Sequence, residues 1–557
     1  MSLWLNRLSL FCLVLLGLAE AEPIPGADLI LSNGRIWTGG VNPSITEALA
    51  IKGDRILAAG STVEIDTYQS EETERIDLQG RFVMPGFIDN HTHFLEGGFQ
   101  LLGLDLRISS DEQDFARRIG ERAEWIPRGE WITGGDWDHE SWPSQQVPHK
   151  RLIDPVTAHT PVFVTRLDGH MGLANRLALK LAGIDQNTPD PPGGMIIRHE
   201  DGEPTGLLKD AAMDLVTRVI PAPSEAERRQ ALQAALDEAA RLGVTTVNAM
   251  ASSGEIRLYQ NLLREGALSL RVYALTPLPD YEDLQKIGIQ RGLGNDYLKI
   301  GASKGFMDGS LGSSTAWFYE PYLDAPETRG IPSAMWLPEG NMKRLVKEAD
   351  SAGLHVAVHA IGARANDEIL KIFEEVSREN GDKDRRFRIE HAQHLTTQTI
   401  GRFDDLGVIA SMQPYHTIDD GRWAEKRIGP ERIRTSYAFR SLLKAGAILT
   451  FGSDWPVAPL NPLLGVYAAV TRRTLDGKNP QGWVPEEKIS TEEALVCYTV
   501  NNAFAIFQED QLGTLEAGQL ADLIVLSANP LEVDPVEIAD IQVIRTIVGG
   551  KTVYSRR

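Results

Sequence analysis

His91 and His93 are the first residues of the chain whose type and spacing could bind a metal ion. They follow Phe87-Ile88, an apolar run that Pro85-Gly86 opens, and this context is typical of a buried strand. In a strand, residues i and i+2 point to the same side, so both imidazoles could reach one ion. A His-x-His pair alone is weak support, because two histidines occur together by chance often enough. The preceding strand strengthens the interpretation.

Further polar residues stand in the same kind of place, directly after a short apolar run. They are Lys304, His359, His391 and Asp454. Considered singly, each is more simply explained as a satisfied core histidine or a capping aspartate. Together with the first pair they supply imidazoles and a carboxylate, which suit Zn²⁺ and other divalent first-row ions. We therefore expect a centre that binds divalent metal, with zinc as the preferred ion.

Lys304 needs a separate explanation, because an ammonium beside a divalent cation is repelled and has no lone pair to donate. After carboxylation by CO₂ the same side chain is an anion with two oxygens, which can bridge two ions. The alternative is that Lys304 pairs with Asp308 or contacts substrate, and the sequence leaves both open.

The elements that must position these residues alternate between helix and strand. A helix is expected over 225–242 with a strand over 244–247, and another helix over 342–352 with a strand over 355–358. The same alternation recurs around 298–303, 387–389, 408–410 and 447–450. It predicts an α/β fold, a (β/α)₈ TIM-type barrel, in which function sits at the carboxyl ends of the strands.

Both ends of the chain show a different texture of short strands and turns. Asn33-Gly34 after a strand at 28–31 indicates a hairpin, and Gly53-Asp54 lies between two further short strands. Strands at 521–526 and 544–548 repeat this texture. We expect one small β-sandwich domain from residues 22–84 and 505–557. The barrel would then span 85–504, with an insertion at about 94–223 over its mouth.

The first residues are typical of an export signal. Arg7 precedes an apolar run over 8–18, and Ala19-Glu20-Ala21 has the small residues of a cleavage site. The run is shorter than the roughly 20 apolar residues of a membrane span. We expect residues 1–21 to be a cleaved signal peptide and the protein to be periplasmic or secreted, with no membrane attachment afterwards; an uncleaved anchor is the alternative. Cys497 would be the single cysteine left, as a buried apolar residue.

The composition restricts the partners. Apolar residues make up 42% and charged residues 24% of the chain, a profile of soluble globular proteins. A formal net charge of −21 without a basic cluster excludes nucleic acid, because a polyanion would be repelled. The expected partner is a small-molecule substrate, and the sequence leaves a homo-oligomer open.

At the positions described above, the sequence resembles the amidohydrolase superfamily, and within it the YtcJ-like branch that includes N-substituted formamide deformylases. The resemblance covers nearly the whole chain after the export signal. It is carried by residues 83–93, 168–170 with 174–175, 304–310, 359–362, 388–393, 452–456 and 513–522. These motifs are highly specific for the family and much less so for the substrate.

The resemblance implies a two-metal centre with one bridging group. The more buried metal would be held by His91 and His93 with Asp454, the second by His359 and His391, and the bridge would be carboxylated Lys304. His170 in the insertion and His416 after the strand near 408–410 are predicted to bind substrate. The alternative for both is a hydrogen-bonded structural histidine.

The expected protein is an exported metal-dependent amidohydrolase. It would cleave a C–N bond of an amide, formamide or cyclic amide by attack of a metal-bound hydroxide. Asp454 would carry the proton from the attacking water to the leaving nitrogen. The same centre could instead serve a lactonase, an esterase or a phosphotriesterase. A non-catalytic exported binding protein is the second alternative, and Asp454 argues against it because binding alone needs no proton shuttle.

Overall fold

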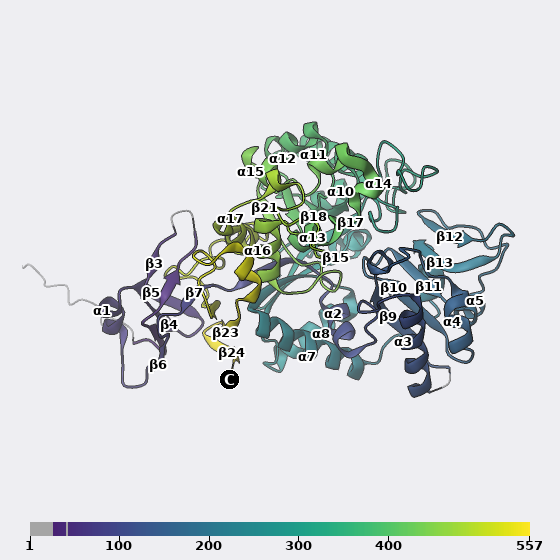
Figure 1. The fold of residues 1–557 in the computed structure, drawn as a ribbon. Helices are drawn as coiled ribbons and strands as arrows, with labels where there is room; N and C mark the ends of the chain where they lie inside the picture. Colours follow the sequence, from purple (N-terminus) through teal and green to yellow (C-terminus); the bar gives the residue numbers. More distant parts are fainter. Residues whose placement is uncertain (1–25, 41–42, 128, 557) are drawn as a thin grey trace, which may run out of the picture.

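The structure, a computed structural model, describes residues 26–40, 43–127 and 129–556. The expected signal peptide, residues 1–21, lies outside the described residues. Figure 1 shows three parts side by side: a β-rich part at one end, a barrel in the middle and an inserted sheet at the opposite end.

The central part is a parallel sheet whose main path has eight strands and nearly closes on itself. In spatial order the strands are β8 (Phe87–Thr92), β14 (Val244–Met250), β15 (Arg271–Pro277), β17 (Leu298–Phe306), β18 (His355–Ala360), β19 (Arg388–His391), β20 (Ile409–Met412) and β21 (Leu449–Phe451). A parallel bridge between Thr92 and Trp455 connects the first strand to the loop after the last. The predicted (β/α)₈ barrel is confirmed. The third strand, β15, was not expected from the sequence, since no candidate ligand follows it.

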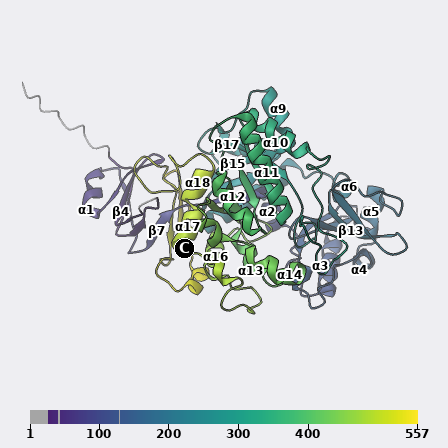
Figure 2. The same ribbon diagram turned by 90° about the horizontal axis from the view of Figure 1, so that it is seen from above.

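Helices cover the outside of the barrel (Figure 2). The predicted helix over 225–242 is α7 (Glu225–Leu242), which begins with a capping box of Ser224 and Glu227 and ends at Gly243 in the left-handed conformation. The other helices around the barrel are α2 (Phe94–Leu102), α8 (Ser253–Arg264), α9 (Tyr281–Lys286), α10 (Asn341–Ser351), α11 (Ala363–Asn380), α12 (Thr397–Asp405), α13 (Pro414–Asp420), α14 (Ala424–Arg432), α15 (Phe439–Lys444), α16 (Pro462–Thr471), α17 (Thr491–Tyr498) and α18 (Val500–Ala505). Among the described helices, none is both long and apolar enough to cross a membrane.

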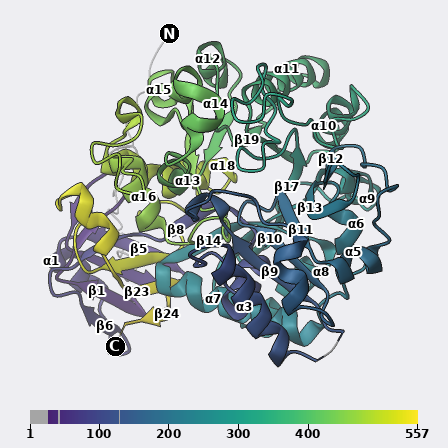
Figure 3. The same ribbon diagram turned by 45° about the vertical axis from the view of Figure 1, so that its right-hand side comes forward.

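The chain between α2 and α7 forms a sheet of its own, which comes toward the viewer in Figure 3. Its spatial order is β12 (Gly194–Arg198), β13 (Pro204–Asp210), β11 (Met171–Ala174), β10 (Val162–Arg166) and β9 (Ile132–Trp137). The helices of this part are α3 (Glu112–Trp125), α4 (Lys150–Ile153), α5 (Arg176–Ala182) and α6 (Asp214–Thr217). Trp137 and Trp142 are buried in its core with Phe115. The insertion therefore has its own apolar core.

The β-rich part consists of two sheets built from both ends of the chain. One sheet has the order β5 (Arg55–Gly60), β4 (Ala48–Lys52), β1 (Leu29–Ser32) and β6 (Glu74–Asp77). The other has the order β24 (Lys551–Ser555), β23 (Val543–Val548), β22 (Leu523–Leu526), β7 (Phe82–Pro85), β2 (Arg35–Trp37) and β3 (Ile45–Thr46). Apolar side chains from both sheets share one core cluster. The predicted small β-sandwich domain from both chain ends is confirmed.

The hairpin expected at Asn33-Gly34 is wrong. β1 pairs with β4 and β6, whereas β2 pairs with β3 and β7 in the other sheet. Asn33 does adopt a turn conformation, with a φ of +56°, but the chain crosses there from one sheet to the other. All four residues of β1 are buried, so β1 buries more apolar surface as a central strand than it would as half of a hairpin. The turn at Gly53-Asp54 does join an antiparallel pair, β4 and β5.

Arg271, the first residue of β15, attaches the barrel to the terminal domain. Its Nε and Nη2 donate hydrogen bonds of 2.7 and 2.8 Å to the two carboxylate oxygens of Asp522. Both side chains are buried, and Asp522 also accepts a hydrogen bond from the N–H of Gly549. A bidentate pair of this kind fixes both distance and orientation, so it holds the domain in place beneath the barrel.

Candidate metal centre

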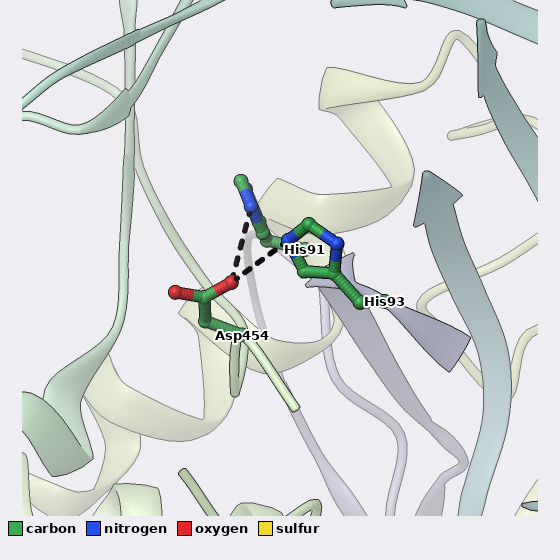
Figure 4. A group of neighbouring side chains, drawn as sticks. All are labelled: His91, His93 and Asp454. Atoms are coloured by element: carbon green, nitrogen blue, oxygen red, sulfur yellow. Dashed lines mark ion pairs between the residues drawn. The ribbon is translucent and has the colours of Figure 1, made fainter. Parts of the chain in front are cut away.

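His91 at the end of β8 and His93 directly after it face Asp454, which follows β21 (Figure 4). The Nε2 atoms of the two histidines lie 3.3 and 3.5 Å from the same carboxylate oxygen, Oδ1. Backbone hydrogen bonds fix this approach, because the N–H of Asp454 donates to the carbonyl of His91 and the N–H of His93 to that of Trp455, each at 2.8 Å. The contact between the first and last strands of the barrel thus creates the cluster.

A second cluster uses the same aspartate. Side-chain atoms of His391, His416 and Asp454 lie within 4.8 Å of one another, which is compatible with a shared metal ion. The Nε2 of His416 is 4.0 Å from Asp454 Oδ2, so the two oxygens of this carboxylate face different histidine groups. His416 was predicted as a substrate contact, and its position gives it the geometry of a metal ligand as well. The Nδ1 of His391 is 2.8 Å from Gln413 Oε1.

Two members of these clusters have a left-handed backbone. The φ angle is +60° at Asp454 and +75° at His391, which costs of the order of 1–3 kcal/mol at a residue with a Cβ. Regular alternation would turn Glu390 and His391 to opposite faces of β19. Instead Glu390 contacts His91 inside the barrel while His391 lines the cavity at its mouth. The left-handed backbone at His391 therefore allows two consecutive side chains, Glu390 and His391, to contribute to the same site.

Glu390 is a functional residue that the sequence reasoning missed. Its Oε2 lies 2.5 Å from Nδ1 of His91, and Arg388 and Ser411 donate further hydrogen bonds to its carboxylate. Burial favours the neutral acid, but Arg388 and His91 outweigh it and hold the pKa of Glu390 well below its usual range. An ionised Glu390 keeps the proton of His91 on Nδ1 and leaves the lone pair of Nε2 for a metal. The position of Glu390 directly before His391 was the available signal.

Three buried histidines of the centre, His91, His359 and His391, are held in the neutral form that binds metal. Burial, followed by the nearby Lys304, lowers the pKa of His91 to about 4. Burial also depresses the pKa of His391 far below its ordinary value, and that of His359 in the same direction. Asp454 stays ionised, because the surrounding imidazoles outweigh its burial and depress the pKa of its carboxyl. Neutral imidazoles around one carboxylate are a suitable donor set for a divalent cation.

Lys304 and His359 lie beside these clusters. Lys304 is buried, with its Nζ 3.3 Å from Nε2 of His91, and burial lowers the pKa of its ammonium to about 8. The ring of His359 lies 4.5 Å from that of His391, but its Nε2 is 3.1 Å from the carbonyl oxygen of Gly309. The His359 ring thus faces the centre while one of its nitrogens is already engaged.

Asp308 does not pair with Lys304, which had been left open. Its carboxylate instead accepts hydrogen bonds from the backbone N–H groups of Trp317, Ile361 and Gly362 at 2.7, 3.0 and 2.8 Å. The aspartate therefore ties together the loops that follow β17 and β18. Among the described residues Lys304 has no ion pair, so its charge is compensated only at longer range by Glu390 and Asp454.

Two buried polar atoms of the centre have no hydrogen-bond partner among the described residues. They are Oδ1 of Asp454 and Nε2 of His416. Leaving such atoms buried and unsatisfied costs roughly 1–3 kcal/mol each. Each atom offers a lone pair and belongs to one of the two clusters, so a divalent cation bound in each cluster would satisfy both. The residues therefore fit a metal ion.

The insertion delivers His170 to the same place. His170 lies between β10 and β11, and its ring is 5.2 Å from that of His359. Burial disfavours its charged form, yet the hydrogen bond of 2.6 Å to Asp210 raises the pKa of His170 to about 9. Asp168 anchors this turn to the barrel by accepting hydrogen bonds from the hydroxyls of Ser310 and Ser313. A cationic histidine thus projects from the insertion toward the candidate centre.

All predicted site residues line one cavity of about 1110 Å³ between the barrel and the insertion. Its inner end holds His91, His93, Lys304, His170, His359, His391, His416 and Asp454. Its outer part is lined by α2, the start of α7 and the insertion, including Phe99 and Trp131. A cavity of this volume is at or above the upper end of the range for small-molecule sites, so the candidate centre opens into room for a sizeable ligand.

The comparison with protein families decides the assignment. The protein-family model described as "Amidohydrolase family" matches residues 74–554 of the sequence. The chain belongs to the amidohydrolase family. Members of this family are metal-dependent hydrolases, which agrees with the candidate metal-binding clusters around Asp454.

Relatives of this amidohydrolase align over most of its length. Protein LONG AFTER FAR-RED 3 of Arabidopsis thaliana is 39% identical over 543 residues, which is 95% of this chain and 92% of the relative. The Bacillus subtilis (strain 168) protein YtcJ is 32% identical over 94% of this chain and 99% of its own. The N-substituted formamide deformylase of Arthrobacter pascens is 28% identical over 95% of this chain and 98% of its own. The predicted family branch is confirmed.

A solved structure has the same fold as this amidohydrolase. An uncharacterized metal-dependent hydrolase from Pyrococcus horikoshii OT3 matches it with a TM-score of 0.74 and 30% sequence identity. The match covers 91% of this chain and 99% of the other. The similarity therefore includes the terminal domain and the insertion as well as the barrel.

Proposed function

We propose that this amidohydrolase hydrolyses a C–N bond of a small-molecule amide, formamide or cyclic amide. The observation that supports it best is the shared carboxylate: Asp454 lies between two histidine groups, with one oxygen facing each. This carboxylate has an unpartnered oxygen and opens into a cavity large enough for substrate. The similarity to an N-substituted formamide deformylase supports the amide or formamide bond over others.

Two groups of residues would hold divalent metal. They are His91, His93 and Asp454 in one group and His391, His416 and Asp454 in the other, with His359 and Lys304 beside them. Lys304 serves in this proposal as a carboxylated, anionic group, since an ammonium would repel the cations. A divalent cation supplies Lewis acidity, which lowers the pKa of water and polarises a carbonyl.

Asp454 is the proposed proton carrier. Its carboxylate is ionised and buried at the place where attacking water and substrate nitrogen must meet, so it accepts a proton from water and returns it to the nitrogen. An amine is a poor leaving group until it is protonated, so this transfer matters more for an amide than for an ester. His170, cationic through Asp210, is placed to donate a hydrogen bond to the carbonyl oxygen as negative charge develops on it.

The zinc-loaded full chain should be screened against N-formyl amines, N-acyl amino acids, cyclic amides, lactones and phosphotriesters. We expect hydrolysis of at least one amide class, lost on removal of metal and restored by zinc. Turnover confined to lactones or phosphotriesters would contradict the C–N assignment. A protein that purifies without divalent ion and gains no activity with zinc would favour a binding function.

We also propose that the protein is exported and that residues 1–21 are removed. Support comes from the sequence alone, in the apolar run after Arg7 and the small residues before position 22. N-terminal sequencing of the protein recovered from outside the cytoplasm should begin at Glu22. Recovery of an intact N-terminus in the cytoplasm would contradict export.

A further inference from the structure

The wall of the cavity carries more negative than positive charge. Among the described residues that line it, carboxylates clearly outnumber Lys and Arg side chains. Several of these carboxylates are neutralised locally: Asp138 and Asp168 lie beside Arg166, and Asp419 pairs with Arg422. A carboxylate that has no ion pair in such an enclosed cavity favours a ligand with a positive charge, because an unpaired charge is costly there.

Asp420 is one carboxylate that remains without a cation. It accepts hydrogen bonds from the amide of Gln393, at 2.8 Å, and from the hydroxyl of Tyr437, and it forms no ion pair with any described Lys or Arg. Both donors are neutral, and the positive charges of Arg166 and Arg422 act on Asp420 only from beyond ion-pair distance. Burial, together with the negative charge of Asp419, outweighs the two arginines and raises the pKa of Asp420 to about 7. Asp420 and Gln393 both line the cavity.

The position of Asp420 relative to the metal centre follows from helix geometry. His416 and Asp420 are four residues apart on α13, so their side chains lie on the same face, one turn of roughly 5.4 Å apart. His416 is the residue whose Nε2 lies 4.0 Å from Asp454. A substrate whose scissile carbonyl sits at the centre therefore passes Asp420 within the length of a few bonds.

Asp136 is a second, independent carboxylate of this kind. It is 9% exposed, lines the same cavity and forms no ion pair within the described chain. Its partner is the amide of Gln100, whose nitrogen is 2.5 Å from Asp136 Oδ2 and 3.5 Å from the carbonyl oxygen of Pro456. Asp136 thus lies close to the loop that carries Asp454. Arg107 acts on it only from beyond ion-pair distance, so two carboxylates without a direct ion pair among the described residues line the cavity.

We propose that the substrate of this enzyme carries a cationic nitrogen group, an ammonium or a guanidinium, which binds at Asp420 with Asp136 as the second carboxylate on the cavity wall. The inference rests on the proposed function, since it names the class of amide that the centre cleaves. Monoacylated diamines and acylated guanidino compounds have this combination of a neutral amide and a cation a few bonds away. A charge-assisted hydrogen bond to a buried carboxylate is worth more than one between neutral groups, so it discriminates strongly against an uncharged analogue.

The binding test uses two probes of equal shape, n-butylguanidinium and n-butylurea, in calorimetric titrations of the zinc-loaded full chain. We expect the cation to bind at least about tenfold more tightly than the urea, and Asp420→Asn to bring the ratio close to one. Asp283→Asn is the matched control, because it removes one charge from exposed α9 and should leave the ratio unchanged. Equal affinity of the two probes for the wild-type chain would overturn the proposal.

Two further measurements keep the test decisive. If Asp420→Asn does not fold, Asp136→Asn is the second variant and should also lower the ratio several-fold.

Turnover is compared for N-formyl-1,4-diaminobutane and its uncharged analogue N-formylpentylamine, with a preference of about tenfold in kcat/KM expected for the first. If neither is cleaved while the guanidinium preference holds, the proposed reaction fails and the cation site stands. If both are cleaved equally and the probes bind equally, the hydrolase stands and the cation site falls.

Discussion

The imidazole Nδ1 of His91 and the carboxylate Oε2 of Glu390 lie 2.5 Å apart, and neither side chain is exposed to solvent. The two residues come from the first and sixth strands of the barrel. This contact sets which nitrogen of His91 faces the candidate metal position, so it connects the packing of the barrel to the chemistry at its mouth.

Replacing Glu390 by Gln should weaken metal binding by about 10- to 100-fold, because a neutral amide no longer fixes the proton of His91 on Nδ1. Titration of the metal-free protein with zinc measures the change. Glu374→Gln is the control, since Glu374 is an exposed residue of α11 paired with Arg402. Thermal unfolding of both variants separates lost affinity from lost folding, because Arg388 loses its charged partner in the first. Unchanged zinc affinity in a folded Glu390→Gln variant would refute the role assigned to Glu390.

Asp454→Asn should lower kcat by at least about 10²- to 10⁴-fold while the metal content falls only in part. The amide keeps one oxygen for metal but cannot accept the proton that the leaving nitrogen needs. Steady-state kinetics and metal analysis of the same preparation test this. Asp237→Asn, on the exposed face of α7, is the matched control and should behave like the wild type. Near-normal turnover in Asp454→Asn would rule out the proton-carrier role.

Removing metal should destabilise the protein. Without metal, Oδ1 of Asp454 and Nε2 of His416 stay buried with no hydrogen-bond partner among the described residues, whereas bound zinc stabilises only the folded chain. At a free zinc concentration one hundred times Kd, the gain is about 2.7 kcal/mol for one site. Melting curves with chelator and with zinc measure it. Identical melting temperatures in the two conditions would speak against a metal site at this place.

The pair of His170 and Asp210 predicts a pH dependence of stability. The pKa of His170 rises from 6.5 to about 9 in the folded chain, which corresponds to roughly 3 kcal/mol. Because the folded value is the higher one, this stabilisation is complete below pH 6.5 and is lost as the pH rises toward 9. In the metal-free protein, His170→Gln should therefore be less stable than the wild type at pH 6, and the difference should shrink by pH 9.5. A difference that stays constant with pH would contradict a charged His170.

Much of the fold was predictable from local pattern. The helix over 225–242 carries its capping residues and a Gly stop in the sequence, and the structure has the same bounds. Strand β15 was missed because no candidate metal ligand follows it, although Val272-Tyr273-Ala274-Leu275 is an apolar run. The turn at Asn33-Gly34 formed but joined two sheets, since pairing partners depend on residues far away in the chain.

What the sequence by itself determined is the list of polar residues at strand ends. A parallel barrel brings the carboxyl ends of all its strands to one mouth, so His91, Lys304, His359, His391 and Asp454 had to approach one another once the barrel was predicted. The positions of these residues at the ends of strands were sufficient for this prediction, because the barrel topology brings those ends together.

Only the tertiary structure decided which atoms meet. Glu390 and His91 are 299 residues apart, and their contact depends on the closure of the barrel and on the left-handed backbone at His391, which no periodicity predicts. The same holds for Asp454, whose two oxygens face different histidines. It also holds for Asp420, because its lack of an ion pair with the described Lys and Arg side chains appears only when all neighbouring elements are in place. Burial and charge balance are properties of the assembled surroundings, so they are not written in any single stretch of the chain.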